Sequence, residues 1–166
     1  WAYSGSPLVV GDMVIIDAGG EGASTLALHK DTGKKIWTAG DDMPGYACPI
    51  PFTDGRPGVL LFKAKHLVAN ALENGQELWR VPWETNYDVN ASSPFQIGDK
   101  LFVSSGYSTG RAVLFQLTGK SPRELWRNDE LKTKMSSCAS REGFAYGITE
   151  KKARLLCLNL SDGSIV

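Results

Sequence analysis

Short apolar segments alternate with glycine- and aspartate-containing turns along the whole chain. The segment SPLVVGDMVII (Ser6–Ile16) returns as SPFQIGDKLFV (Ser93–Val103), with weaker versions at Cys48–Phe62 and Ser137–Ile148. These segments are rich in Val, Ile, Leu and Phe, which favour strands, and no segment shows sustained helical periodicity. We therefore predict an all-β fold, in which only Asn128–Met135 could form a helical turn.

A second repeat lies downstream of each apolar pair. ALHKDTGKKIW (Ala27–Trp37) returns as ANALENGQELW (Ala69–Trp79), and the chain finishes on CLNLSDGSIV (Cys157–Val166). Each copy has a small residue, a glycine six positions on, and in the two complete copies a tryptophan four positions later. The glycine can take positive φ without steric cost, as a tight hairpin requires. Each unit therefore predicts four short strands in roughly 40–45 residues, a period typical of propeller blades.

The repeat predicts a β-propeller segment of four four-stranded blades. The approximate blades are residues 6–38, 48–80, 93–127 and 136–166, within a single domain or fragment spanning 1–166. Each blade of a propeller buries its faces against its neighbours, so we expect Trp37 and Trp79 to pack between blades.

The spacing A-x5-G-x3-W, preceded by SPxxxGDxxxx, resembles the quinoprotein-type (PQQ-like) propeller repeat. That repeat is shared by pyrroloquinoline quinone (PQQ) dehydrogenases and by the assembly-factor propeller of the bacterial outer membrane. The resemblance covers essentially the whole chain and is irregular in the third blade, where LTGKSPRELW (Leu117–Trp126) inserts residues before the tryptophan. It implies a bacterial protein that is periplasmic or otherwise exported.

Composition narrows the range of partners. The chain has 166 residues, with 18 Lys and Arg balanced by 18 Asp and Glu, so its net charge is zero. Such a surface offers no basic field for phosphates, and we expect no nucleic-acid partner. Apolar runs such as Val59–Phe62 are too short to span a bilayer, so we expect no membrane insertion.

Strand direction alternates within a blade, which sorts the connections into two ends. One end receives the tight turns, and the other receives the long segments Ala39–Cys48, Pro82–Ser92 and Arg127–Ser137. Long loops on a rigid scaffold are where function usually lies. The candidate ligand-binding residues at the long-loop end are Tyr46, Tyr87, Asp88, Asn90, Tyr107, Arg111, Lys132 and Lys134.

These features favour a non-catalytic binding or scaffold propeller that presents its long-loop face to a protein, peptide or glycan. The alternative is part of a PQQ-dependent oxidoreductase whose catalytic residues lie largely outside this segment. The resemblance implies that such enzymes carry adjacent cysteines under the quinone and a calcium ion held by Glu, Asn and Asp. None of Cys48, Cys138 and Cys157 is adjacent to another, so we predict no cofactor, and PQQ with calcium only under the alternative. No catalytic residue or metal ligand is predicted.

The two ends of the chain suggest how the ring is completed. Joined end to start, they restore the glycine-to-tryptophan spacing, which makes Trp1 the end of a preceding outer strand. Either four blades close into a ring, or the chain is a segment of a larger ring. In the second case we expect its partners to be the remaining blades of the parent propeller or a second copy.

Overall fold

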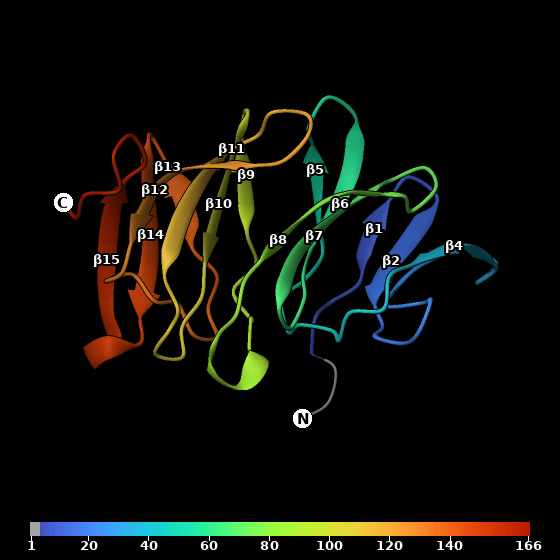
Figure 1. The fold of residues 1–166 in the computed structure, drawn as a ribbon, viewed down its shortest axis with the longest axis horizontal. Coiled ribbons are helices and arrows are strands. Elements are labelled where there is room, and N and C mark those ends of the chain that lie inside the picture. The colour runs from blue at the N-terminus through green and yellow to red at the C-terminus, as the bar shows by residue number, and fades with distance from the viewer. Residues whose placement is uncertain (1–3) are drawn as a thin grey trace.

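The structure is a computed structural model that describes residues 4–166, and its four antiparallel sheets stand side by side in chain order (Figure 1). The first blade contains β1 (Leu8–Val10), β2 (Met13–Asp17), β3 (Thr25–His29) and β4 (Lys35–Ala39). The second contains β5 (Ile50–Thr53), β6 (Pro57–Phe62), β7 (His66–Ala71) and β8 (Glu77–Pro82). The third contains β9 (Phe95–Ile97), β10 (Lys100–Ser104), β11 (Ala112–Gln116) and β12 (Arg123–Asn128).

The fourth blade has three strands, β13 (Ala139–Arg141), β14 (Phe144–Thr149) and β15 (Arg154–Asn159). A single antiparallel bridge from Leu158 to Ile165 marks the place of its outer strand. Two short 3-10 turns, η1 (Asn86–Asp88) and η2 (Lys151–Ala153), are the helical elements of the described residues. Within that part of the chain, no helix is long and apolar enough to cross a membrane. The predicted all-β propeller segment is confirmed, and the predicted role of Trp1 lies outside the described residues.

The helical turn predicted at Asn128–Met135 is wrong. The side-chain Oδ1 of Asn128 accepts hydrogen bonds from the backbone N–H groups of Glu130 (2.9 Å) and Leu131 (3.0 Å). This local turn competes with helix formation. The chain then buries Leu131 and pairs Thr133 with Thr149 in an antiparallel bridge, so tertiary contacts hold the segment extended.

The repeated tryptophan and glycine meet across blade boundaries. The indole Nε1 of Trp37 donates to the carbonyl of Leu72 in the next blade at 3.0 Å, and a Cβ added at Gly75 would lie 2.5 Å from its ring. Trp126 repeats the arrangement with Leu160 (3.0 Å) and Gly163. The glycine is thus needed both for positive φ and for close approach to the ring. The expected packing of Trp37 between blades is confirmed.

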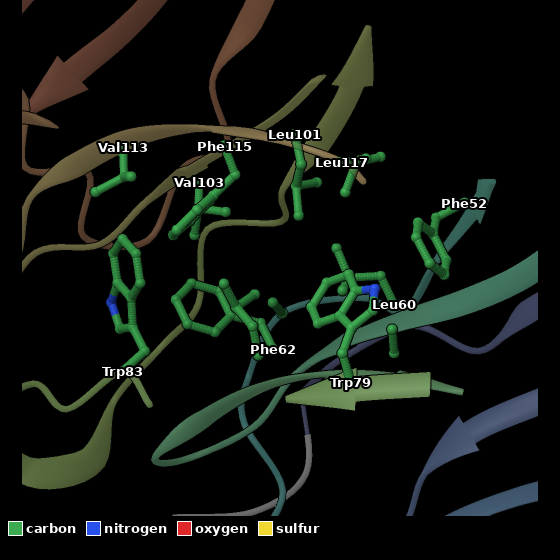
Figure 2. Close-up of a cluster of buried hydrophobic side chains, with 13 residues drawn as sticks. Phe52, Leu60, Phe62, Trp79, Trp83, Leu101, Val103, Val113, Phe115 and Leu117 are labelled. Atoms are coloured by element: carbon green, nitrogen blue, oxygen red, sulfur yellow. The ribbon is translucent and has the colours of Figure 1, made fainter. Parts of the chain in front are cut away.

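The largest apolar cluster fills the boundary between the second and third blades (Figure 2). Trp79 packs edge to face on Phe52, and Trp83 packs edge to face on Phe62. The ring centroids are 5.6 Å apart in each pair. The third blade closes the cluster from the opposite side with side chains of β10 and β11 and with Leu117. Trp79 therefore also packs between blades, as the sequence predicts. Burying one indole hides roughly 200 Å², an upper-bound gain of about 5 kcal/mol.

A ladder of hydrogen bonds joins the blades where the innermost strands begin. The backbone N–H of Ser6 donates to Cys48 Sγ (3.2 Å), that of Cys48 to Ser93 Oγ (3.1 Å), and that of Ser93 to Ser137 Oγ (2.9 Å). Each residue lies two positions before the innermost strand of its blade. The recurring Ser or Cys at this position is therefore explained by the side-chain acceptor that it offers to the preceding blade.

Candidate ligand-binding face

The long connections and the loops between second and third strands meet at one end of the blades, as the alternation of strand direction predicts. The ring of Tyr87, in the β8–β9 connection, meets that of Tyr107, in the β10–β11 loop, edge to face at 6.2 Å. The β14–β15 connection reaches the same place, because Glu150 contacts the backbone at Tyr107. The long-loop end is thus one continuous surface spanning the second to fourth blades.

A cavity of about 460 Å³ opens at this end, beside the residues that precede the innermost strands. Its lining is mixed: aromatic and apolar side chains alternate with hydroxyl and thiol groups. The lining residues are Ser4, Tyr46, Cys48, Val89, Ala91, Ser93, Tyr107, Met135 and Ser137. Pockets that combine apolar walls with a few polar groups are typical ligand sites.

Tyr107 is the centre of the predicted site. Its ring lines the cavity, receives the edge contact from Tyr87, and lies 4.5 Å from the Nζ of Lys134 in a cation–π contact. Tyr87 is 84% exposed and Lys134 is exposed as well. Tyr46 lies on the same cavity wall, so four of the eight predicted residues either line this cavity or contact the Tyr107 ring.

The backbone under Tyr107 adopts a strained conformation that Glu150 holds in place. Tyr107 and Ser108 both have positive φ, 59° and 65°, which non-glycine residues rarely adopt. The Glu150 carboxylate accepts hydrogen bonds from both of their N–H groups at 2.9 Å. Lys132 Nζ donates to the Ser108 carbonyl at 2.5 Å. Lys132 thus supports the loop from its edge, beside a second, more polar cavity that it lines with Ser108 and Glu150.

The remaining predicted residues lie outside this group. Asp88 forms a half-exposed ion pair with Lys65 at 3.8 Å. Asn90 is fully buried, and its amide Nδ2 donates to the carbonyls of Lys63 (3.0 Å) and Ala64 (2.9 Å). The Asn90 side chain therefore fixes the β6–β7 turn and does not reach the cavity.

Arg111 is held on an aromatic ring. Its guanidinium carbon lies 4.0 Å from the centroid of Trp83, whose Nε1 donates to Ser105 Oγ at 2.8 Å. Partial burial, together with the positive charge of Arg127, lowers the pKa of Arg111. This stacking links the second and third blades behind the Tyr107 loop.

Sequence reasoning missed Glu150, Met135 and the Ser/Cys positions of the cavity wall. The recurring Ser or Cys before each innermost strand was a usable signal, because residues at equivalent places in successive blades lie side by side, and Cys48, Ser93 and Ser137 line the same cavity. Glu150 gave no such signal, since its role depends on a backbone conformation in another blade.

The residues present do not fit a PQQ–calcium site. Across residues 4–166, no group of three or more His, Cys, Asp or Glu side chains lies close enough to hold a metal ion. Cys48, Cys138 and Cys157 are free thiols far apart in sequence, and burial raises the pKa of Cys138 to about 12. We therefore derive no redox step through this segment.

The repeat, the blade packing and the hydrogen-bond ladder before the innermost strands together define a PQQ-like β-propeller segment. A family model described as outer membrane protein assembly factor BamB matches residues 2–166, and the chain belongs to this family. A comparison with curated proteins found no significant match.

Solved structures share the fold. BamB from Moraxella catarrhalis matches with a TM-score of 0.75 and 18% identity over 96% of this chain. Quinohemoprotein alcohol dehydrogenase from Comamonas testosteroni matches with a TM-score of 0.68 and 12% identity over 99% of this chain. The computationally designed Ika4 protein matches with a TM-score of 0.62 and 10% identity, over 96% of this chain and 94% of the designed chain. The chain spans 49% of the BamB structure and 34% of the dehydrogenase.

Proposed function

We propose that the chain is a non-catalytic binding propeller whose long-loop face takes a protein ligand. The observation that supports this most directly is the arrangement around Tyr107, whose ring lines the cavity with Tyr46 and contacts Tyr87 and Lys134. Tyrosine is enriched in protein interfaces because its ring is apolar and its hydroxyl is polar. The exposed ring of Tyr87 is held by Tyr107, so that little freedom is lost on binding.

The charges of the face favour a segment with acidic groups. No ion pair within the described residues involves Lys132 or Lys134. The ammonium group of Lys132 donates to a backbone carbonyl and that of Lys134 lies over the Tyr107 ring. Both can still attract a carboxylate. A family described as outer membrane protein assembly factors also favours a protein over a glycan. By the same resemblance, we propose a periplasmic location, which fractionation of the native cells tests.

Peptide selection tests the binding function. Peptides enriched from a phage-displayed random library on the immobilised chain are measured by calorimetry against the Tyr87→Ala/Tyr107→Ala variant. We expect affinity to fall by about tenfold or more, because buried aromatic contacts dominate interfaces. Asp31→Ala, in an exposed turn at the opposite end, is the matched control and should bind as the unaltered chain does.

Two outcomes contradict the proposal. Selected peptides that bind the double variant as tightly as the unaltered chain would place the ligand elsewhere. Enrichment of no peptide, together with saturable binding on a glycan array that is lost in the double variant, would replace the protein ligand with a glycan.

A further inference from the structure

At two of the three boundaries between blades, a main-chain carbonyl and a glycine of the next blade contact the tryptophan ring. At the boundary between the second and third blades, these two contacts are missing. From Ala69 to Trp79 is ten positions, whereas from the matching Leu114 to Trp126 is twelve, so the β11–β12 turn is two residues longer. This turn faces Trp79. A Cβ added at its glycine, Gly119, would meet nothing within 4 Å, whereas those of Gly75 and Gly163 would press on Trp37 and Trp126. The longer turn therefore leaves Trp79 without a glycine packed on its ring.

At the boundary without these contacts, two buried polar atoms are left unpaired. Nε1 of Trp79 has no hydrogen-bond partner among residues 4–166, although the residue is only 6% exposed. The carbonyl at the matching position, that of Leu117, accepts from Gln116 Nε2 at 3.2 Å. Asp54 Oδ1 accepts from the Gly119 N–H at 2.6 Å, while its buried Oδ2 has no partner in the described chain. A buried donor or acceptor left unpaired is costly, which makes both atoms strong sites for a complementary group.

Both residues line a recess of about 290 Å³ at the tight-turn end, opposite the long-loop face. Its other lining residues are Gly55, Arg56, Leu78 and Gly119. One water occupies about 30 Å³ in the liquid, so the recess has room for a larger group. Nε1 and Oδ2 are both buried, and the turn at 118–121 beside them is exposed.

We propose that this recess binds the main chain of a peptide at a glycine or another small residue. The equivalent places at the other two boundaries already show what fits: a main-chain carbonyl on the indole N–H and a glycine against the ring. In the recess, a peptide carbonyl accepts from Trp79 Nε1, and a main-chain N–H of the same peptide donates to Asp54 Oδ2. Arg56 at the rim supplies a charge for a nearby acidic group of the same peptide. The partner is thus a protein segment recognised through its backbone.

The indole N–H resonances of the intact, nitrogen-15-labelled chain test this directly. The probe is the capped tripeptide acetyl-Ala-Gly-Ala-amide. We expect the Trp79 resonance, assigned with Trp79→Phe, to start upfield of those of Trp37 and Trp126 and to move downfield saturably as peptide is added. The other two indoles already donate to carbonyls and should stay in place, which makes them internal controls.

Two variants separate the proposed contacts from a general surface effect. Asp54→Asn keeps an oxygen for the Gly119 N–H but removes the carboxylate acceptor, and should raise the peptide Kd at least about fivefold. Replacing Leu117–Pro122 with Leu-Glu-Asn-Gly, the sequence at 72–75, restores the shorter turn. In that variant the Trp79 resonance should lie downfield without peptide, the peptide response should vanish, and the melting temperature should rise.

Three results overturn the proposal. An unmoved Trp79 resonance at saturating peptide shows that only water fills the recess. Equal movement of all three indoles shows non-specific binding. A response to methyl glucoside, with none to the peptide, assigns the recess to a sugar.

Discussion

The buried ion pair between the first and second blades yields the sharpest stability prediction. Lys63 Nζ lies 2.5 Å from Asp17 Oδ1, and it also donates to the hydroxyl (2.7 Å) and carbonyl (3.0 Å) of Ser24. The two charged side chains are 1% and 6% exposed. Asp17 Oδ2 accepts the Gly45 N–H at 3.1 Å. All three donors of the ammonium group are therefore used, and the pair joins the end of β2, the turn after β6 and the β4–β5 connection.

Lys63→Met removes the cation and leaves the Asp17 carboxylate buried with one backbone donor. Breaking a buried pair from one side costs about 3–5 kcal/mol, because the remaining charge stays without compensation. We expect the free energy of unfolding to fall by that amount at pH 7. In Lys63→Met/Asp17→Asn, the amide oxygen still accepts the Gly45 N–H and no buried charge remains. The double variant should recover about 1–3 kcal/mol of the loss.

The deficit of Lys63→Met should also depend on pH. In the unaltered chain, burial raises the pKa of Asp17 against the opposing charge of Lys63, and burial lowers the pKa of Lys63. Without Lys63, the pKa of Asp17 rises further, so between the unfolded and folded pKa values the folded state binds more protons. Stability lost at pH 7 should therefore return as pH falls, by at most about 1.4 kcal/mol per unit, until the unfolded pKa near 3.9 is reached.

Urea unfolding followed by tryptophan fluorescence, at constant ionic strength and several pH values, measures these differences. The comparison of each variant with the unaltered chain at the same pH removes the contribution of other groups. A loss below about 1 kcal/mol for Lys63→Met, or a double variant less stable than the single one, would refute the argument. Either result would mean that the pair is hydrated, or that packing of the lysine stem matters more than its charge.

Four further predictions follow from the blade boundaries and the candidate site. Trp37→Ala should cost about 3–5 kcal/mol in urea unfolding, whereas Ile36→Ala, at a 44% exposed neighbour, should cost under about 1; equal losses would contradict the assigned packing. Glu150→Ala should weaken selected peptides about tenfold by freeing the β10–β11 loop, with Glu73→Ala, in an exposed turn at the opposite end, as the unaffected control; unchanged calorimetry would remove Glu150 from the site. Calorimetry with PQQ and calcium should show no binding, and a micromolar Kd would restore the oxidoreductase alternative. Light scattering should detect self-association through the outer face of the fourth blade, where Leu155 is 70% exposed, and Leu155→Lys should reduce it; a strict monomer at all concentrations contradicts this.

The sequence predicted the scaffold well because the repeat reports interactions that recur at each boundary. Glycine and tryptophan at fixed spacing predicted the hairpins and the packing of Trp37, since each depends on a turn conformation and on one neighbouring blade. The alternating strand direction correctly placed the long loops together, with Tyr46 and Tyr107 on one cavity and Tyr87 and Lys134 against the Tyr107 ring.

Prediction failed where contacts between distant segments decide the environment of a side chain. Asn90 lies in a polar loop, a pattern typical of an exposed residue, yet two carbonyls in a turn more than twenty positions earlier bury its amide. Lys63 likewise lies at the end of an apolar run, where a solvent-facing charge is expected. Its burial requires Asp17 in another blade, and no local pattern links the two.

Departures from the repeat were more informative about binding than the repeat itself. At the two regular boundaries the indole N–H is paired with a main-chain carbonyl and a glycine packs on the ring, so the indole offers nothing to a ligand. The two-residue insertion at Leu117–Pro122 breaks this pairing and leaves Trp79 Nε1 and Asp54 Oδ2 unpaired. The Tyr107 loop departs in another way, by holding positive φ without glycine, and it needs Glu150 from the next blade to do so. In a fold stabilised by repetition, binding sites are expected where one blade stops satisfying its neighbour, because only there do polar groups and cavities remain for a partner.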